Sequence, residues 1–137
     1  MRIMSVDLGL ARTGLAVGDT GSTLAFPKTV ITEYNEQRLI EKVCAAALEE
    51  KAARIVVGLP RNMDGSEGER AAKCRELATK INECSKIETV MWDERCTTVS
   101  AHNALNANNV RREKRKQTVD AVAAVIILED YLRFLNK

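Results

Sequence analysis

Short apolar runs separated by turn-rich segments dominate the chain and predict five β-strands. The first run ends at Asp7, and Gly9 follows, so a hairpin is expected with bare backbone where a phosphate or a metal ion could approach. Pro27 marks the third strand as an edge strand or the site of a bulge. The predicted strands are residues 3–7, 12–19, 23–32, 54–59 and 88–92.

Apolar residues at helical spacing predict longer elements between and after the later strands. Asn35 is the expected N-cap of the first helix, and Thr97 or Thr98 caps a short helix that ends near Leu105. Asp120 falls in the first turn of the last helix, among apolar neighbours. The three longer helices are predicted at residues 36–51, 69–83 and 117–134.

The order of these elements predicts an α/β fold in a single domain, residues 1–137. Three consecutive strands form an antiparallel meander, and helices separating the later strands imply parallel crossovers. The expected structure is a mixed five-stranded sheet with helices on both faces. The sequence shows no internal repeat, low-complexity segment or interdomain linker.

Composition adds little to this picture. Aromatic residues make up 4% of the chain, so the core must be aliphatic, and the net charge of +2 does not by itself imply a polyanionic partner. No apolar run reaches the roughly 20 residues of a membrane span, and the N-terminus has no signal-peptide layout. We therefore expect a cytoplasmic protein with no membrane partner.

The cysteines do not have the spacing of a zinc site, because none forms a Cys-x-x-Cys pair and the chain has one histidine, His102. We expect reduced thiols that pack as small apolar groups. They are Cys44, Cys74, Cys84 and Cys96.

Acidic residues stand at three positions that the predicted fold can bring together: Asp7, the pair Asp93 and Glu94, and Asp120. Each also has an ordinary structural interpretation: a turn residue, a solvated strand end, and an acid favoured near a helix N-terminus by about 0.3–1 kcal/mol. As a set, such carboxylates would repel one another, and a divalent cation would remove that repulsion. Oxygen ligands suit Mg²⁺ or Mn²⁺.

Positive charge surrounds the same acids. A basic run directly precedes Asp120, and Arg12 and Arg95 lie near the other acids. The run could be a solvated loop, but cations beside a metal centre are also what a phosphodiester backbone needs. The run comprises Arg111, Arg112, Lys114, Arg115 and Lys116, and with Arg12 and Arg95 it forms the predicted nucleic-acid-binding set.

Four ordered motifs covering nearly the whole chain resemble the YqgF/RuvX family of RNase H-like nucleases. In order they are Asp7-Leu8-Gly9 with Arg12-x-Gly14-x-Ala16-x-Gly18-Asp19; Val56-Val57-Gly58-Leu59-Pro60 with Asn62-Met63-Asp64-Gly65-Ser66; Asp93-Glu94-Arg95-x-Thr97-Thr98; and Lys116-x-x-x-Asp120-x-x-Ala123-Ala124, followed by Ile127-Leu128 and Tyr131-Leu132.

The resemblance implies an RNase H-like fold and metal-dependent cleavage of nucleic acid at Asp7, Glu94 and Asp120, with Mg²⁺ or Mn²⁺ as cofactor. Asp7 would bridge two ions about 3.5–4 Å apart. The strand before Pro60 lacks the acid found in many RNase H-like enzymes, so Asp93 or Asp64 could replace or assist Glu94.

The family is linked to 5′-end processing of precursor 16S ribosomal RNA and has also been proposed to resolve Holliday junctions, and we favour RNA. Two other classes stay open: an actin-like ATPase, disfavoured because this chain has one half of that fold, and a non-catalytic nucleic-acid or ribosome-binding factor. The expected partners are precursor rRNA or branched DNA, with ribosomal particles possible. The sequence does not decide between a monomer and a homodimer, although a symmetric junction resolvase would need the two active sites of a dimer.

Overall fold

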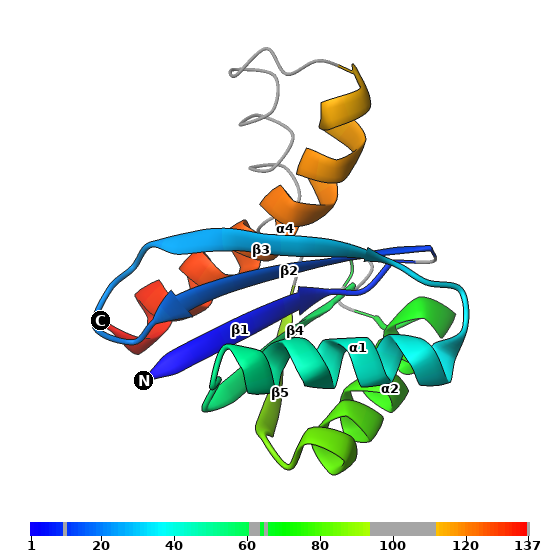
Figure 1. Cartoon of the computed structure of the whole chain (residues 1–137), viewed down its shortest axis with the longest axis horizontal. Helices are drawn as coiled ribbons and strands as arrows, with labels where there is room; N and C mark the ends of the chain where they lie inside the picture. The colour runs from blue at the N-terminus through cyan, green and yellow to red at the C-terminus, as the bar shows by residue number, and fades with distance from the viewer. Residues whose placement is uncertain (10, 61–63, 65, 94–111, 137) are drawn as a thin grey trace.

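The protein forms a five-stranded mixed sheet with helices on both faces (Figure 1). The computed structural model describes residues 1–9, 11–60, 64, 66–93 and 112–136, and along residues 112–121 it describes the backbone alone. The strand order is β3-β2-β1-β4-β5. The strands are β1 (Arg2–Asp7), β2 (Arg12–Asp19), β3 (Ala25–Thr32), β4 (Arg54–Leu59) and β5 (Glu88–Asp93).

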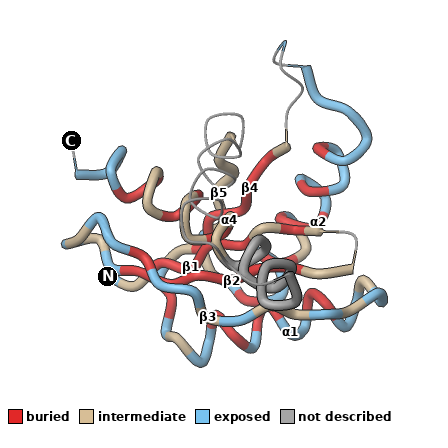
Figure 2. Tube along the Cα trace, turned by 90° about the horizontal axis from the view of Figure 1, so that it is seen from above, coloured by how far each residue is buried: buried red, intermediate tan, exposed pale blue. Residues whose placement is uncertain are grey.

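The central strand is β1, which pairs antiparallel with β2 and parallel with β4. Residues 3–6 are buried on both faces, as expected for a strand covered by helices on each side (Figure 2). The predicted meander and parallel crossovers are therefore confirmed. Asp7, at the end of β1, lies in the middle of the sheet's width.

Two helices, α1 (Glu36–Glu49) and α2 (Glu69–Ser85), cover one face of the sheet, and α4 (Arg112–Leu135) covers the other (Figure 1). The side chains of β1 alternate between two apolar clusters. Met4 and Val6 belong to the cluster under α1 and α2, and Ile3 belongs to the cluster under α4. This alternation shows toward which helices each side chain of β1 points.

The ends of α1 follow from local chemistry. Asn35 is the N-cap, as predicted, and its Oδ1 accepts a hydrogen bond from the Arg38 amide at 3.0 Å. The helix ends at Glu49, two residues before the predicted end. Lys51 has φ 55°, which an α-helix cannot continue, and the Ala52 amide instead donates to the Ala47 carbonyl at 2.9 Å.

The third strand starts later than predicted, because residues 20–24 form a turn in which Ser22 Oγ accepts from the Leu24 amide at 3.0 Å. Both interpretations of Pro27 are confirmed. The strand is an edge strand, and the register shifts between Leu15 and Ala16, which pair with Thr29 and Pro27. A bulge at Lys28 accounts for that shift.

The largest correction concerns α4, which begins at Arg112 rather than at residue 117. The basic residues from Arg112 to Lys116 are therefore helical and do not form a loop before the helix. Asp120 stands eight residues into α4, so its interpretation as a first-turn acid is wrong. The short helix predicted from residue 97 or 98 to 105 lies outside the described residues.

Smaller differences affect other predictions. The second helix continues to Ser85, where Lys86 with φ 62° ends it, and β5 continues to Asp93. Cys44 and Cys74 are buried as expected, and burial is the main cause that raises the pKa of the Cys44 thiol to about 12. Cys84 is exposed, against the prediction. Cys96 is outside the described residues.

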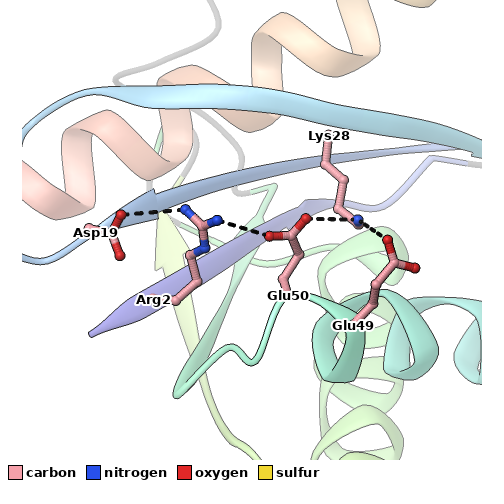
Figure 3. Close-up of polar contacts among 5 residues, drawn as sticks. All are labelled: Arg2, Asp19, Lys28, Glu49 and Glu50. Carbon is pink, nitrogen blue, oxygen red and sulfur yellow. Dashed lines mark hydrogen bonds and ion pairs between the residues drawn. The ribbon is translucent and has the colours of Figure 1, made fainter.

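A chain of ion pairs joins the start of β1 to its neighbours (Figure 3). Arg2 contacts Asp19 at 3.4 Å and Glu50 at 3.2 Å, and Lys28 contacts Glu50 at 2.9 Å and Glu49 at 3.2 Å. These contacts connect β1, β2 and β3 with the C-terminus of α1. They lie at the opposite end of β1 from Asp7.

Within the part of the chain that the structure describes, no helix combines the length and the apolar character needed to span a bilayer.

Candidate active site

Asp7 ends the central strand, half-buried, on the face covered by α4. On β1, Ile3 packs in the α4 cluster, and Ser5 Oγ donates a 2.6 Å hydrogen bond to the Ala124 carbonyl of α4. Because side chains two residues apart on a strand share a face, Asp7 follows Ile3 and Ser5 on this face.

Glycines flank Asp7 in the sheet. Gly14 of β2 pairs directly with it, and the register of β1 with β4, in which Val6 pairs with Val57, brings Gly58 level with it on the other side. Neither neighbour contributes a side chain, so only backbone lies beside the carboxylate within the sheet. A bulky ligand such as a phosphate can approach an acid in this setting more closely than one between branched side chains.

Gly9 has a different role from the one expected. A Cβ at this position would lie 2.2 Å from the carbonyl oxygen of Arg12, so the space beside Gly9 is already filled by the hairpin's own backbone. Glycine is needed there to close the hairpin that carries Asp7, rather than to admit a ligand.

The direction of α4 brings its Asp120 position to the Asp7 end of β1. Arg54, at the start of β4, donates to Tyr131 Oη at 2.7 Å, whereas Ala124 lies beside Ser5, so α4 runs antiparallel to β1. Position 120 is about 6 Å before Ala124 along the helix axis. Asp7 is about 6.6 Å beyond Ser5 along the strand. The two positions therefore lie at the same end of the α4 face.

The second ligand was predicted at the end of β5. Val90 and Trp92 pack with the α4 cluster and Met91 with the opposite cluster, so alternation directs Asp93 to the α1 and α2 face. Asp93 and Asp7 are thus on different faces of the sheet. Glu94 lies outside the described residues.

Asp64, the other substitute considered for Glu94, takes part in a local turn. Its Oδ1 accepts hydrogen bonds from the Ser66 amide at 2.9 Å and from Ser66 Oγ at 2.6 Å. This is the geometry of an aspartate that stabilises its own loop. It favours a structural role for Asp64 over a role as a metal ligand.

The predicted cations lie in different parts of the fold. Arg12 is half-buried at the start of β2, at the same end of the hairpin as Asp7. The positions Arg112, Lys114, Arg115 and Lys116 occupy the first turns of α4, a part of the helix that extends past the sheet in Figure 1. Arg95 and Arg111 lie outside the described residues.

One cation beside the Asp7 loop, Arg70, is not among the predicted phosphate-binding residues. Its Nη2 donates to the carbonyl oxygen of Leu8, the residue after Asp7, at 3.1 Å. A signal existed: Arg70 is in the first turn of α2, where the helix dipole disfavours a positive charge, so another interaction has to compensate.

A metal-binding cluster of three or more acidic, histidine or cysteine side chains is absent from the described residues, of which Glu94 is not one. The side chain of Asp120 is likewise not described. Of the three predicted metal ligands, Asp7 is the one whose side chain is described, and it is a carboxylate at a strand end with glycine on each side. Such an oxygen donor fits Mg²⁺ or Mn²⁺.

A cavity of about 350 Å³ lies between α2 and the edge strand β5, on the face opposite to that of Asp7. Its polar side chains already have partners: Arg75 holds Glu67 through two contacts of 2.7 and 2.8 Å, and Asn82 donates to the Ile87 carbonyl at 2.8 Å. Within the described residues, these two side chains of the cavity are therefore already engaged in contacts with the protein itself.

Comparison with known proteins adds family information to this geometry. The model of the RuvX family, described as Holliday junction resolvase, matches residues 1–134. A Bacillus cytotoxicus protein named "Putative pre-16S rRNA nuclease" is 39% identical over 136 residues, which cover 96% of this chain and 98% of the relative. A Bacillus thuringiensis protein of the same name is 37% identical over 134 residues, with the same coverage of 96% and 98%.

Two solved structures share the fold. Thermus thermophilus RuvC in complex with a Holliday junction substrate has a TM-score of 0.62 at 12% identity, covering 98% of this chain and 96% of RuvC. Fowlpox virus resolvase with Holliday junction DNA has a TM-score of 0.61 at 11% identity, covering 100% of both chains. At such identities the likeness shows the fold alone, and it confirms the predicted RNase H-like architecture.

Proposed function

The chain belongs to the RuvX family, and from this premise we propose that it is a nuclease that hydrolyses phosphodiester bonds at the 5′ end of precursor 16S ribosomal RNA. The observation that carries the proposal is similarity over nearly the full length to relatives named for that activity. Processing of precursor rRNA would give the protein a role in ribosome biogenesis in the cytoplasm, with ribosomal particles as partners.

Asp7 is the centre of the proposed site. Its place at the end of the central strand, between Gly14 and the Gly58 position, supports close approach of a substrate phosphate. The antiparallel course of α4 supports a contribution from Asp120, and the orientation of Asp93 toward the other face favours Glu94 as the third acid. Asp7, Glu94 and Asp120 are the proposed catalytic residues.

These three carboxylates would hold Mg²⁺ or Mn²⁺, which supplies Lewis acidity and neutralises the charge that develops on the phosphate. The reaction is hydrolysis: water adds its oxygen to phosphorus, and the bond from phosphorus to one ribose oxygen breaks. Backbone beside Asp7 lets the phosphate reach the acid. Cations hold the flanking phosphates in place. The proposed phosphate-binding set is Arg12, Arg95, Arg111, Arg112, Lys114, Arg115 and Lys116.

The test is cleavage of an end-labelled RNA that contains the 16S 5′ leader, with Mg²⁺ or Mn²⁺. Loss of residues that support a metal ligand costs 10–100-fold in activity, so Asp7→Asn, which alters a ligand itself, should reduce cleavage at least about 100-fold. Asp19→Asn is the matched control, because Asp19 ends the other strand of the same hairpin and pairs with Arg2. Cleavage by Asp7→Asn at the wild-type rate would refute the proposed site.

A second candidate is cleavage of four-way DNA junctions, favoured by the description of the matching family model. The same variants tested on a synthetic junction and on the RNA leader separate the two substrates. Asp7-dependent cleavage of the junction with an intact RNA leader would identify the protein as a resolvase instead.

A further inference from the structure

Arg70 joins α2 to the loop that follows Asp7. It is the second residue of α2, and its Nη2 donates to the carbonyl of Leu8 at 3.1 Å across 62 positions of sequence. Leu8 is 5% exposed, so its carbonyl belongs to a well-packed segment. The guanidinium is thereby held one residue from the proposed catalytic acid.

The course of the chain brings Arg70 to this end of the sheet. The strand β4 runs parallel to β1, so the carboxyl end of β4 lies at the same end of the sheet as Asp7. The helix α2 follows β4 in the chain. Figure 1 shows the first turn of α2 and the end of β1 on the same side of the molecule. Arg70 and Asp7 therefore reach the same end of the sheet, Arg70 from the face covered by α1 and α2 and Asp7 from the face covered by α4.

The charge of Arg70 has no carboxylate partner within the described residues. Farther along α2 the cations are paired: Lys73 and Lys80 contact Glu36, and Arg75 contacts Glu67. Arg70 instead contacts a neutral carbonyl, and its side chain is exposed. A guanidinium has five N–H donors, and among the described residues the Leu8 carbonyl accepts from one of them, so four can bind an anion.

We propose that Arg70 binds a phosphate of the nucleic acid beside the bond cut at Asp7, and that its contact with the Leu8 carbonyl orients the guanidinium for this purpose. The proposal rests on the proposed nuclease function. Arginine suits such a role because its planar fork binds two phosphate oxygens at once, while one remaining donor fixes the side chain to the protein. Lysine offers a point charge without that geometry.

The experiment measures binding separately from cleavage. In the Asp7→Asn background, the dissociation constant for the leader RNA is determined at several salt concentrations, with and without Arg70→Gln. Loss of one phosphate contact should weaken binding roughly tenfold and lower the slope of log affinity against log salt by about one. Arg70→Lys should keep the slope and recover only part of the affinity.

Arg133→Gln is the matched control, because it removes an exposed arginine from the last turn of α4, at the far end of the molecule. Thermal unfolding of each variant reports whether the fold is intact. Equal affinity and salt slope for the Arg70 and Arg133 variants would overturn the phosphate contact while leaving the nuclease proposal in place. A second result would also overturn it: slower cleavage by Arg70→Gln with Asp7 intact, combined with unchanged RNA binding in the Asp7→Asn background, because Arg70 would then only hold the loop.

The nuclease proposal itself fails under a different result. If wild-type protein binds the RNA with an Arg70-dependent salt slope but cleaves neither the leader nor a four-way junction with Mg²⁺ or Mn²⁺, the phosphate contact stands and the protein is a binding factor.

Discussion

A single missing Cβ determines the geometry of the hairpin that carries Asp7. The carbonyl oxygen of Arg12 occupies the place where a side chain at Gly9 would begin. At the neighbouring positions glycine has another effect, because Gly14 leaves the flank of Asp7 without a side chain. Individual glycines on this hairpin therefore serve two purposes, one in closing the backbone and one beside the acid.

Gly9→Ala tests the first purpose. Its Cβ would meet backbone at 2.2 Å, which cannot rotate away, so we expect a loss of about 2 kcal/mol or more in unfolding free energy. Urea unfolding of the purified variant measures it. Gly21→Ala is the control, since nothing lies within 4 Å of a Cβ there, and its stability should change by less than about 0.5 kcal/mol. Equal stability of the two variants would contradict this role for Gly9.

At the scale of elements, charged contacts join the two helices on one face of the sheet. Glu36 in the first turn of α1 contacts both Lys73 and Lys80 of α2. Hydrogen bonds from Lys73 and then Lys80 lower the pKa of Glu36 from 4.5 to about 2. A carboxyl with a depressed pKa in the folded state stabilises that state above its unfolded value and stops doing so as the pH falls.

Because the pKa of Glu36 is lowered in the folded state, the effect of Glu36→Gln on stability should depend on pH. We expect the variant to be less stable than wild type at pH 6, with the difference constant down to about pH 4.5 and shrinking between pH 4.5 and about 2. Urea midpoints across this range measure it, at low salt because exposed pairs are screened. Glu83→Gln, an exposed acid on α2, is the control. If the stability difference between wild type and Glu36→Gln grew as the pH fell, Glu36 would not be the carboxylate that its contacts with Lys73 and Lys80 stabilise.

At the scale of the whole molecule, the two ends of the central strand differ: one is joined to its neighbours by ion pairs, and the other carries the proposed catalytic acid. Ion pairs join the start of β1 to β2, β3 and α1, whereas the end of β1 meets α4 and the first turn of α2. The Ser5 contact with α4 lies between these ends. A ligand that joins Asp7 to α4 would therefore stabilise elements that are distant in sequence.

Metal binding should accordingly stabilise the fold. A metal at 100 times its dissociation constant adds about 2.7 kcal/mol to the free energy of unfolding. We expect Mn²⁺ to raise the melting temperature of wild type and of Asp19→Asn, and chelation with EDTA to reverse the rise. In Asp7→Asn the rise should be largely lost. A rise of the same size in Asp7→Asn would show that the metal binds elsewhere.

The sequence by itself determined the succession of strands and helices along the chain and the pairing direction of the strands, because short apolar runs and apolar residues at helical spacing are local patterns. It also predicted the N-cap at Asn35 and the family, since both depend on residues at fixed spacing. Asp7 was identified in the same way, as an acid that ends a buried strand.

Tertiary structure decided the features that depend on residues distant in sequence. The contact of Arg70 with Leu8 spans 62 positions, and the face of Asp93 follows from which cluster receives Met91 and Trp92. The helix α4 starts at Arg112 and not at the predicted residue 117, because a run of basic residues is compatible with either a loop or a helix. In the opening hairpin, sequence identified Gly9 as special, but only the folded backbone, with the Arg12 carbonyl in place of a Cβ, revealed the reason.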